Sequence, residues 1–558
     1  MAFIKSRLAS EANVYVRWLF FSSGRLHIGR GLFIFAVPMN RFLSLATLLG
    51  LLASAHAELQ LPAIISDHMV LQQKQSDPVW GWDTPGTKIT VTFGGQTKTA
   101  NAAADGKWTV KLDPMPANAQ AQTLIIKGTS KKEIQDVLIG EVWMCSGQSN
   151  MGFTLNSEWN GDLEAAASNL PNLRLIKVPQ VGTQDLKTDF KGAWRASNAD
   201  SASTFSAVGF LYGRYLHNIL GIPVGLIDNS WGGSAAEAWI RRDTVEKDPR
   251  FKLLMDNTRK TEAYNQTAQA KTEYEARLAK WKEDVAAAKT AGKPLPRQPQ
   301  GPEQWLSGNA RPGNIFAGVV YPTLGYGMKG VIWYQGESNA GRAYEYRELF
   351  PFMIEQWRKE WGQGDFPFYW VQLANFMPVK PEPVDSNWAE LREAQTMTMK
   401  APNTGQAVII DVGEGKDIHP KDKHDVAARL VRWPLVKDYC LKFPYRSPEF
   451  KSLAIEGNKA IVTLDYFGSS LRPFGVEEAL GFAVCGEDKV WHWAKGKVLP
   501  GDRIEVSCDK VAAPIAVRYA WADNPVCNLF SKDGLPVTPF RTDDFPPITK
   551  PAPQPAAK

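Results

Sequence analysis

The chain has 558 residues, 44% of them hydrophobic and 22% charged, which is typical of a globular protein with about three or four domains. Its net charge of +6 comes mostly from residues 1–57, which hold six Lys/Arg and one acid, so the remainder is close to neutral. Because residues 58–558 are close to neutral, they lack the excess of basic residues that nucleic-acid binding requires, and we expect no nucleic-acid partner.

Residues 1–57 predict a targeting segment. Met39-Asn40-Arg41 precedes an apolar run of about a dozen residues, and Ala55-His56-Ala57 matches the A-x-A cleavage pattern. We therefore expect a mature chain from Glu58, with residues 1–38 an extension upstream of the true start. The protein is then exported, periplasmic or extracellular, without stable membrane association after cleavage. An uncleaved membrane anchor is the alternative.

Two regions alternate at period two and predict β structure. They are residues 58–135, read as a β-sandwich, and residues 443–547. Expected strands include 79–82, 89–93, 108–112, 460–465, 503–507 and 516–520. The Pro/Ala-rich end, residues 548–558, predicts a disordered tail.

Residues 136–240 and 313–442 instead alternate strands with amphipathic helices, which indicates an α/β domain with a parallel sheet. Candidate strands are 134–145, 224–229, 330–334 and 407–410, and candidate helices are 205–220, 342–361 and 421–440.

Residues 241–312 interrupt this α/β pattern. Tyr274, Leu278, Trp281 and Val285 share one helical face, so we expect a helical insertion packed over the carboxyl edge of the sheet. It could cap an active site or lie far from it.

Ser149 is the candidate nucleophile. It follows the apolar strand 134–145 in the turn-forming run Ser146-Gly147-Gln148-Ser149-Asn150. The carboxyl ends of strands are where open α/β sheets carry their chemistry. The alternative is a purely structural role, a turn whose serines cap the following helix.

His419 is the candidate base, because a serine needs a base to remove its proton. Residues 58–558 hold five histidines, and His419 alone follows a predicted α/β strand on a loop. Asp417, two residues away, could orient the ring or stabilise imidazolium.

Two glycine-rich strand ends could supply oxyanion donors. In residues 225–234 the N–H of Gly232 or Gly233 can approach a ligand, and residues 330–339 carry the amide of Gln335. Trp231, Glu337 and Asn339 are candidate substrate-binding residues on the same turns.

The cysteines are Cys145, Cys440, Cys485, Cys508 and Cys527, an odd number that leaves at least one unpaired, although a bridge between the third and fourth is possible. No C-x-x-C or H-E-x-x-H spacing supports a metal site, so we expect neither metal nor cofactor.

The segments "GEVWMCSGQSNM", "DNSWGGSAAEAW", "VIWYQGESNA", "DVGEGKDIHPKDK" and "WADNPVCNLF" resemble sialate O-acetylesterase-type carbohydrate esterases of the SGNH hydrolase superfamily. They span the α/β domain and part of the C-terminal β region. The resemblance implies a flavodoxin-like three-layer α/β/α core with accessory β-sandwich regions at both ends, and metal-free hydrolysis of acetyl esters on sugars.

Residue by residue, the resemblance makes Ser149 the nucleophile, His419 the base and Gly232 an oxyanion donor together with the N–H of Ser149. Two positions depart from the wider superfamily. Ser338 stands where its third-block asparagine falls, so Gln335 is the replacement amide donor. A lysine stands three residues before the histidine, so Asp417 is the expected acid. Asp411, or a backbone carbonyl in a Ser-His dyad, is the alternative.

The predicted function is a carbohydrate O-acetylesterase working through a Ser-His-(Asp) acyl-enzyme mechanism on an acetylated glycan. Because no basic cluster is evident in the sequence, an acetylated plant polysaccharide such as xyloglucan or xylan rivals sialic acid as substrate. A non-catalytic sugar-binding protein is the alternative from another functional class, and a lipase is weaker because no apolar lid stands out.

Overall fold

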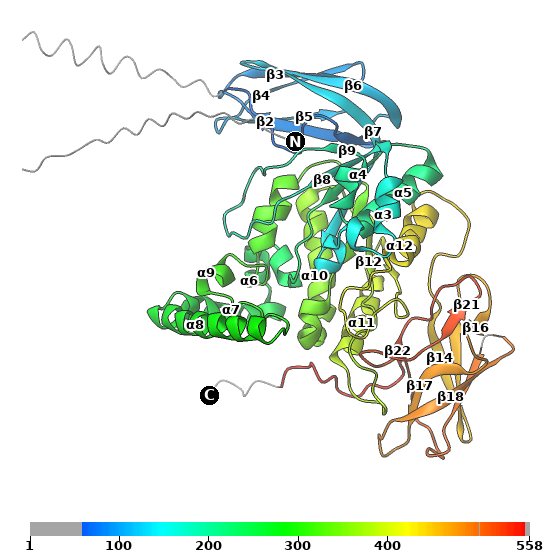
Figure 1. The fold of residues 1–558 in the computed structure, drawn as a ribbon. Helices are drawn as coiled ribbons and strands as arrows, with labels where there is room; N and C mark the ends of the chain where they lie inside the picture. Colours follow the sequence, from blue (N-terminus) through cyan, green and yellow to red (C-terminus); the bar gives the residue numbers. More distant parts are fainter. Residues whose placement is uncertain (1–57, 502, 553–558) are drawn as a thin grey trace, which may run out of the picture. The chain divides into compact units, whose positions relative to one another are not determined.

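The computed structural model describes residues 58–501 and 503–552 and has a mixed α/β architecture (Figure 1). The predicted targeting segment, residues 1–57, and most of the predicted tail lie outside the described residues. Within the described residues, no helix has both the length and the apolar character needed to cross a membrane.

The N-terminal region is built from antiparallel pairs and one parallel pair. β2 pairs with β5, β3 pairs with β4 and β6, β6 continues onto β7, and β1 runs parallel to β7. Side chains of β3 and β5 alternate between buried and more exposed, as their period-two patterns predict. The strands are β1 (Val70–Gln72), β2 (Asp77–Trp82), β3 (Lys88–Phe93), β4 (Gln96–Asn101), β5 (Lys107–Leu112) and β6 (Asn118–Lys127).

β7 (Lys131–Gly147) is the longest strand of the described chain and belongs to both the N-terminal region and the parallel sheet. Its first half pairs antiparallel with β6, and its second half pairs parallel with β10 and β11. The boundary predicted between residues 135 and 136 therefore falls inside one continuous strand, although the amino-acid pattern changes there.

The parallel sheet has the order β13-β12-β11-β7-β10-β8, with β9 added antiparallel at the β8 edge. Its strands besides β7 are β8 (Leu170–Lys177), β9 (Arg195–Ser197), β10 (Val224–Asp228), β11 (Gly330–Tyr334), β12 (Phe368–Val371) and β13 (Thr404–Ala407). The expected strand 407–410 is displaced: ladder pairing with β12 ends at Ala407. Val408 and Ile410 instead pack into the core of the C-terminal region, which accounts for their apolar character.

The side chains of β11 alternate between two apolar cores. Val331 and Trp333 pack in one core with α10, whereas Ile332 and Tyr334 pack in a second core with α5 and α12. The helices are α2 (Ser149–Gly152), α3 (Gly161–Ala166), α4 (Ala199–Ser203), α5 (Ala207–Leu220), α6 (Arg242–Lys247), α7 (Lys252–Asn265), α8 (Ala268–Thr290), α9 (Pro302–Leu306), α10 (Ala343–Trp361), α11 (Asn387–Met397) and α12 (Lys423–Lys437).

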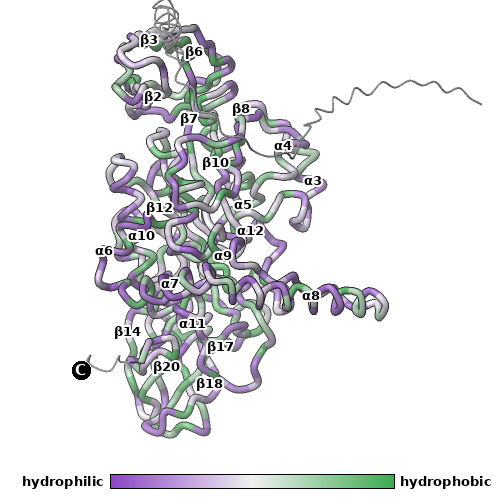
Figure 2. Tube along the Cα trace, turned by 90° about the vertical axis from the view of Figure 1, so that its left-hand side faces the viewer, coloured by the Kyte–Doolittle hydropathy of each residue, from purple (hydrophilic) through white to green (hydrophobic). Residues whose placement is uncertain are grey.

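The insertion between β10 and β11 is helical, as its periodicity predicts, and its largest helix, α8, is mostly polar and reaches beyond its neighbours (Figure 2). The predicted face of α8 is the half-buried one, but the loop that follows the helix covers it. Trp281 Nε1 donates to Pro296 O at 2.8 Å, and Gly301 packs against the Tyr274 ring. This face therefore packs on the insertion's own loop and not on the sheet.

The C-terminal region is an antiparallel sheet of order β14-β15-β19-β18-β17-β20-β22, with a separate β16-β21 pair. Its strands are β14 (Glu449–Glu456), β15 (Lys459–Asp465), β16 (Leu471–Pro473), β17 (Ala479–Cys485), β18 (His492–Leu499), β19 (Arg503–Ser507), β20 (Ala516–Tyr519), β21 (Leu529–Ser531) and β22 (Phe540–Arg541). All five cysteines lie in the described residues and are unpaired, so the possible bridge between Cys485 and Cys508 is not formed.

Candidate active site

Ser149 is the first residue of α2, directly beyond the carboxyl end of β7. The turn that exposes it depends on Gly147, which has a φ of 132°. A Cβ at Gly147 would lie 2.2 Å from Tyr334 O on β11, so only glycine fits there. The N–H of Ser149 has no acceptor within its own helix, because it belongs to the first turn.

The structure brings His419 to Ser149. The two residues are 270 positions apart in sequence, yet His419 Nε2 lies 2.8 Å from Ser149 Oγ. His419 stands on the loop between β13 and α12, at the same sheet edge as the serine. With the ring hydrogen on Nδ1, the serine hydroxyl can donate to Nε2, which is the arrangement that a general base requires.

Asp417 lies on the Nδ1 side of the histidine. Its Oδ1 is 3.3 Å from His419 Nδ1 and also accepts the backbone N–H of His419 at 2.9 Å. The alternative acid, Asp411, accepts two hydrogen bonds from Arg429, at 2.6 and 2.8 Å. The Asp411 carboxylate is thus engaged by a guanidinium, whereas the Asp417 carboxylate faces the imidazole.

Gly232, the candidate oxyanion donor, lies beside Ser149. A Cβ placed on Gly232 would be 3.3 Å from Ser149 Cβ, so the two backbones approach closely. The turn that carries Gly232 is joined to the serine turn by the N–H of Trp231, which donates to Gly147 O at 2.9 Å. Trp231 itself is half-buried and packs against the core.

Gln335 does not have the role that the sequence predicted. Its side chain is fully buried, and Nε2 donates both hydrogens internally, to Ser234 O at 3.0 Å and to Asn339 Oδ1 at 2.7 Å. Its Oε1 accepts from Tyr346 at 2.9 Å. An amide whose donors are both used cannot also hold an oxyanion, so Gln335 braces the loop after β11.

Asn339 is likewise an internal residue and not a substrate contact. It is buried, its Oδ1 also accepts the N–H of Ala236 at 2.9 Å, and its Nδ2 donates to Glu237 at 3.0 Å. These bonds join the loop after β11 to the turn after β10.

A polar cluster behind the serine joins Glu337, predicted from the sequence as a candidate substrate-binding residue, to Asn150 and Lys423, for which the sequence predicted no role in the site. Asn150 Nδ2 donates to Glu337 at 2.7 Å and to Ile418 O at 3.0 Å, while its Oδ1 accepts from Lys423 Nζ at 2.7 Å. Asn150 therefore ties the serine turn to the residue before His419. Its place next to the nucleophile was the only sequence signal for this role.

Burial shifts the pKa values of both charged members of this cluster. Lys423 is completely buried, and burial lowers its pKa to about 7, although the Glu337 carboxylate opposes that shift. Burial also raises the pKa of Glu337, against its hydrogen bond from Asn150. The ammonium of Lys423 lies 4.8 Å from the centroid of the Phe153 ring and 5.3 Å from that of Tyr334.

Hydrogen bonds through Asn375 also connect the loop that carries His419 to the C-terminal region. Gly413 N donates to Asn375 Oδ1 at 2.7 Å, and Asn375 Nδ2 donates to Asn524 Oδ1 at 2.8 Å. Asn524 Nδ2 in turn donates to Met377 O at 2.6 Å. Asn524 belongs to the segment "WADNPVCNLF", which thereby reaches the base of the histidine loop.

A cavity of about 540 Å³ opens at Ser149. Its lining includes two lysines and a carboxylate besides the serine and glycines. The lining residues are Ser149, Gly152, Lys177, Val178, Pro179, Gln180, Lys191, Asp228, Ser230 and Gly232. Burial raises the pKa of Asp228, against the effect of Lys177, whose Nζ lies 3.7 Å from Oδ2.

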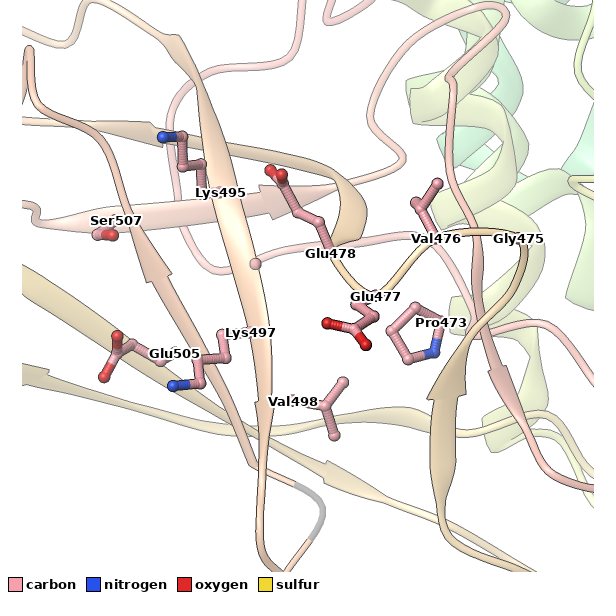
Figure 3. Close-up of a pocket in the computed structure, with 11 residues that line it drawn as sticks. Pro473, Gly475, Val476, Glu477, Glu478, Lys495, Lys497, Val498, Glu505 and Ser507 are labelled. Carbon is pink, nitrogen blue, oxygen red and sulfur yellow. The ribbon is translucent and has the colours of Figure 1, made fainter.

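A larger groove, of about 960 Å³, lies on the C-terminal sheet and carries mostly charged side chains (Figure 3). Lys495, Lys497, Glu477, Glu478 and Glu505 line it, and it contains neither the serine nor the histidine. The chemistry of the side chains, and not the size of the cavity, identifies the active-site region.

A strand-end serine within hydrogen-bond distance of a histidine, in a mixed α/β protein, is the arrangement that serine hydrolases use. The sequence family described as "Carbohydrate esterase, sialic acid-specific acetylesterase" matches residues 313–426. The solved structure of a carbohydrate acetylesterase from Xanthomonas citri is 35% identical, with a TM-score of 0.73, over 87% of this chain and 100% of that one.

Two mammalian relatives extend the likeness over most of the chain. The mouse sialate O-acetylesterase is 29% identical over 534 residues, which cover 87% of this chain and 95% of the mouse protein. The human sialate O-acetylesterase is 27% identical over 533 residues, which cover 87% and 93%. This chain belongs to the carbohydrate acetylesterase family that includes the sialate O-acetylesterases, and it is a carboxylic ester hydrolase.

Proposed function

We propose that the protein releases acetate from O-acetylated glycans, with Ser149 as nucleophile and His419 as general base. The observation that carries this proposal is the 2.8 Å approach of His419 Nε2 to Ser149 Oγ at the edge of a cavity. The names of the relatives, all carbohydrate or sialate acetylesterases, support the ester chemistry.

In the proposed mechanism, Ser149 Oγ attacks the acetyl carbonyl carbon while His419 Nε2 takes the hydroxyl proton. The N–H groups of Ser149 and Gly232 hold the oxyanion of the tetrahedral intermediate. His419 then gives the proton to the departing sugar oxygen, which leaves an acetyl-serine. Water, deprotonated by the same imidazole, hydrolyses that ester and frees acetate.

Asp417 is the proposed acid of the site. Its position 3.3 Å from Nδ1 supports this role, and the hydrogen bond that it accepts from the backbone N–H of His419 would keep the carboxylate next to the ring. The Arg429 pair at Asp411 argues against the alternative acid.

The proposed core is the flavodoxin-like α/β/α arrangement of the SGNH hydrolases. Across the sheet the strands lie in the order β10-β7-β11-β12-β13. Numbered along the chain without β8, which is an added edge strand, this is the order 2-1-3-4-5 of such sheets. The two apolar cores on opposite faces of β11 support the three layers. Ser149 then follows the first strand, where the strand order reverses.

For the glycan, we propose a sugar that carries a carboxylate, as sialic acid does. Lys177 and Lys191 line the cavity that contains Ser149, together with one carboxylate, Asp228. The lining therefore has more cationic than anionic side chains, which favours an anionic ligand. We also propose that residues 1–57 include a cleaved export signal, which N-terminal sequencing of the secreted protein would test.

Acetate release from a panel of O-acetyl sialic acids, acetylxylan, acetylated xyloglucan and acetylated pectin tests the proposal. We expect turnover of the sialic acids, and a loss of at least about 10³-fold in Ser149→Ala and His419→Ala. Ser157→Ala, at an exposed serine of the same region, is the matched control and should be unchanged. Turnover of only the neutral polysaccharides would overturn the substrate assignment, and activity in Ser149→Ala would overturn the mechanism.

A further inference from the structure

The turn that carries Gly232 has a defined type. Ser234 N donates to Trp231 O at 3.3 Å, which closes a four-residue turn with Gly232 and Gly233 at its centre. Gly233 has a φ of 71°, the positive value that a type II turn requires at its third residue. In such a turn the peptide between the two central residues can flip by itself, because compensating rotations leave the flanking residues in place.

A side chain of the helical insertion bonds to that central peptide. Asn309 Nδ2 donates to Gly232 O at 2.5 Å, across 77 positions of sequence. The backbone carbonyl of Asn309 also accepts the N–H of Ala235 at 3.2 Å, so one residue contacts the turn at two places. Reversal of the central peptide would turn the Gly232 carbonyl away from Asn309 and break the first of these bonds.

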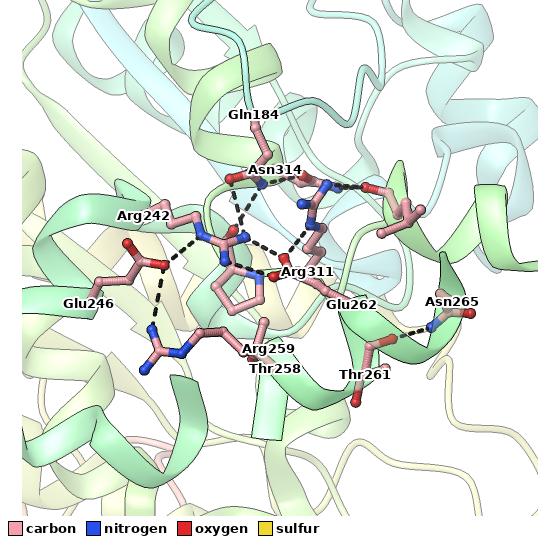
Figure 4. A network of polar contacts seen from close by, with 12 residues as sticks. Gln184, Arg242, Glu246, Thr258, Arg259, Thr261, Glu262, Asn265, Arg311 and Asn314 are labelled. Atoms are coloured by element: carbon pink, nitrogen blue, oxygen red, sulfur yellow. Dashed lines mark hydrogen bonds and ion pairs between the residues drawn. The ribbon is translucent and has the colours of Figure 1, made fainter. Parts of the chain in front are cut away.

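The segment that presents Asn309, residues 306–314, is itself held firmly by a polar network (Figure 4). Asn314 Nδ2 donates to Leu306 O at 2.9 Å and to Gly308 O at 2.8 Å. Arg311 Nε donates to Glu262 on α7 at 2.7 Å, and Arg242 Nη2 donates to the same carboxylate at 2.9 Å. Although burial opposes it, these guanidinium hydrogen bonds hold the pKa of Glu262 below its usual value.

We propose that Asn309 is a positioning residue, which keeps the central peptide of the 231–234 turn in the orientation that directs its own N–H, that of Gly233, to the side of Ser149, where it donates to the oxyanion beside the N–H of Gly232. This inference rests on the proposed function, in which Gly232 is an oxyanion donor. The helical insertion thereby acts on catalysis through residues 306–314, and not through α8 as a lid over the cavity.

The bond from Asn309 is solvent-exposed, and this property separates catalysis from folding. The net contribution of one exposed hydrogen bond is too small to decide whether the protein folds, because water replaces part of what the lost partner supplied. Removal of the Asn309 amide should therefore change the rate of a folded enzyme. A residue with only a structural role would change the fraction of folded enzyme and leave the turnover of each active site unaltered.

The test compares Asn309→Ala and Asn309→Asp with Asn265→Ala. In the aspartate variant the size of the side chain is kept but the donor is lost. Asn265 is the matched control, because its Nδ2 donates to Thr261 O at 2.9 Å within α7 of the same insertion. Turnover of 4-nitrophenyl acetate is measured per active site, titrated with a phosphonate ester, because this small substrate makes no glycan contacts. Affinity for methylboronic acid, which forms a tetrahedral adduct with the serine, is measured alongside.

For both Asn309 variants we expect kcat to fall about 3- to 10-fold, the effect of one net hydrogen bond, with KM changed less than about twofold. Boronate affinity should fall by the same factor, and Asn265→Ala should match the wild type. If kcat and boronate affinity in Asn309→Ala stay within about twofold of wild type, the inference is overturned.

Turnover of 4-nitrophenyl acetate by Ser149→Ala, measured per mole of protein because this variant has no serine to titrate, keeps the two proposals distinguishable. An inactive Ser149→Ala beside an unimpaired Asn309→Ala would overturn the positioning role alone. A wild type that releases no acetate, or a fully active Ser149→Ala, would overturn the proposed function itself.

Discussion

Replacement of Asp417 by asparagine tests how much the acid contributes at this site. The carboxylate Oδ1 lies 3.3 Å from His419 Nδ1, and during catalysis the imidazole becomes positively charged. At 3.3 Å the Coulomb energy of such a pair is about 1 kcal/mol in a water-like dielectric and about 5 kcal/mol at an effective dielectric of 20.

The solvent exposure of the two side chains decides which of these two Coulomb energies applies. The side chains of His419 and Asp417 are 33% and 45% exposed, so the dielectric around the pair is closer to that of water. We therefore expect a loss of about 1 to 2 kcal/mol of transition-state stabilisation in Asp417→Asn, or roughly 5- to 30-fold in kcat/KM. A buried aspartate in a serine protease triad contributes far more, about 10⁴-fold.

The assay is the kcat/KM of acetate release by Asp417→Asn and Asp411→Asn, each per titrated active site. The second variant is the control, because Asp411 is bonded to Arg429 and its loss should lower stability more than turnover. A decrease of less than about twofold in Asp417→Asn would favour a Ser-His dyad and refute the acid assignment. A decrease beyond about 10³-fold would refute the reasoning from exposure.

Three further variants probe the surroundings of the site. Gln335→Leu should lower the free energy of unfolding by about 2 to 4 kcal/mol, because it leaves buried partners such as Ser234 O unpaired. Its kcat/KM per folded enzyme should fall less than about tenfold, and a 100-fold loss would restore Gln335 as an oxyanion donor. Lys423→Met removes a lysine whose pKa burial lowers from 10.5 to about 7. The unfolded chain binds the extra proton in that window, so wild-type stability relative to the variant should rise from pH 7 to 10 by about 1 kcal/mol per pH unit. Urea unfolding at several pH values measures this difference, and a flat or falling one would contradict it. Asn524→Ala should lower kcat/KM about 3- to 10-fold by loosening the His419 loop, with unchanged kinetics in Asn265→Ala as control. An unchanged kcat/KM in Asn524→Ala would mean that the histidine loop does not depend on this contact.

Local patterns predicted several of the longer elements of the described chain. The expected strand 330–334 matches β11, and the expected helices 205–220 and 342–361 begin within two residues of α5 and α10. β12 was missed because its four residues, Phe-Tyr-Trp-Val, are too short a run to separate a strand from a buried turn. Strand 407–410 was misplaced because an apolar run indicates burial and does not say which core buries it.

The site was predictable where a residue's role depends on its own strand end. Ser149 and His419 each follow a strand in polar, turn-forming sequence, and the carboxyl ends of parallel strands meet at one edge. Gln335 also follows a strand, but the direction of its amide depends on Ser234, Asn339 and Tyr346, which no local pattern connects to it.

The sequence by itself determined the α/β core, the two β regions, the helical insertion and the candidate serine and histidine, because periodicity and turn chemistry act between neighbouring residues. The tertiary structure alone decided the partners: Asp411 bonds to Arg429 while Asp417 faces the imidazole, and Asn309 reaches Gly232 across 77 positions. Hydrogen bonds depend on distances of about 3 Å in space, and spacing along the chain does not constrain those distances between remote residues.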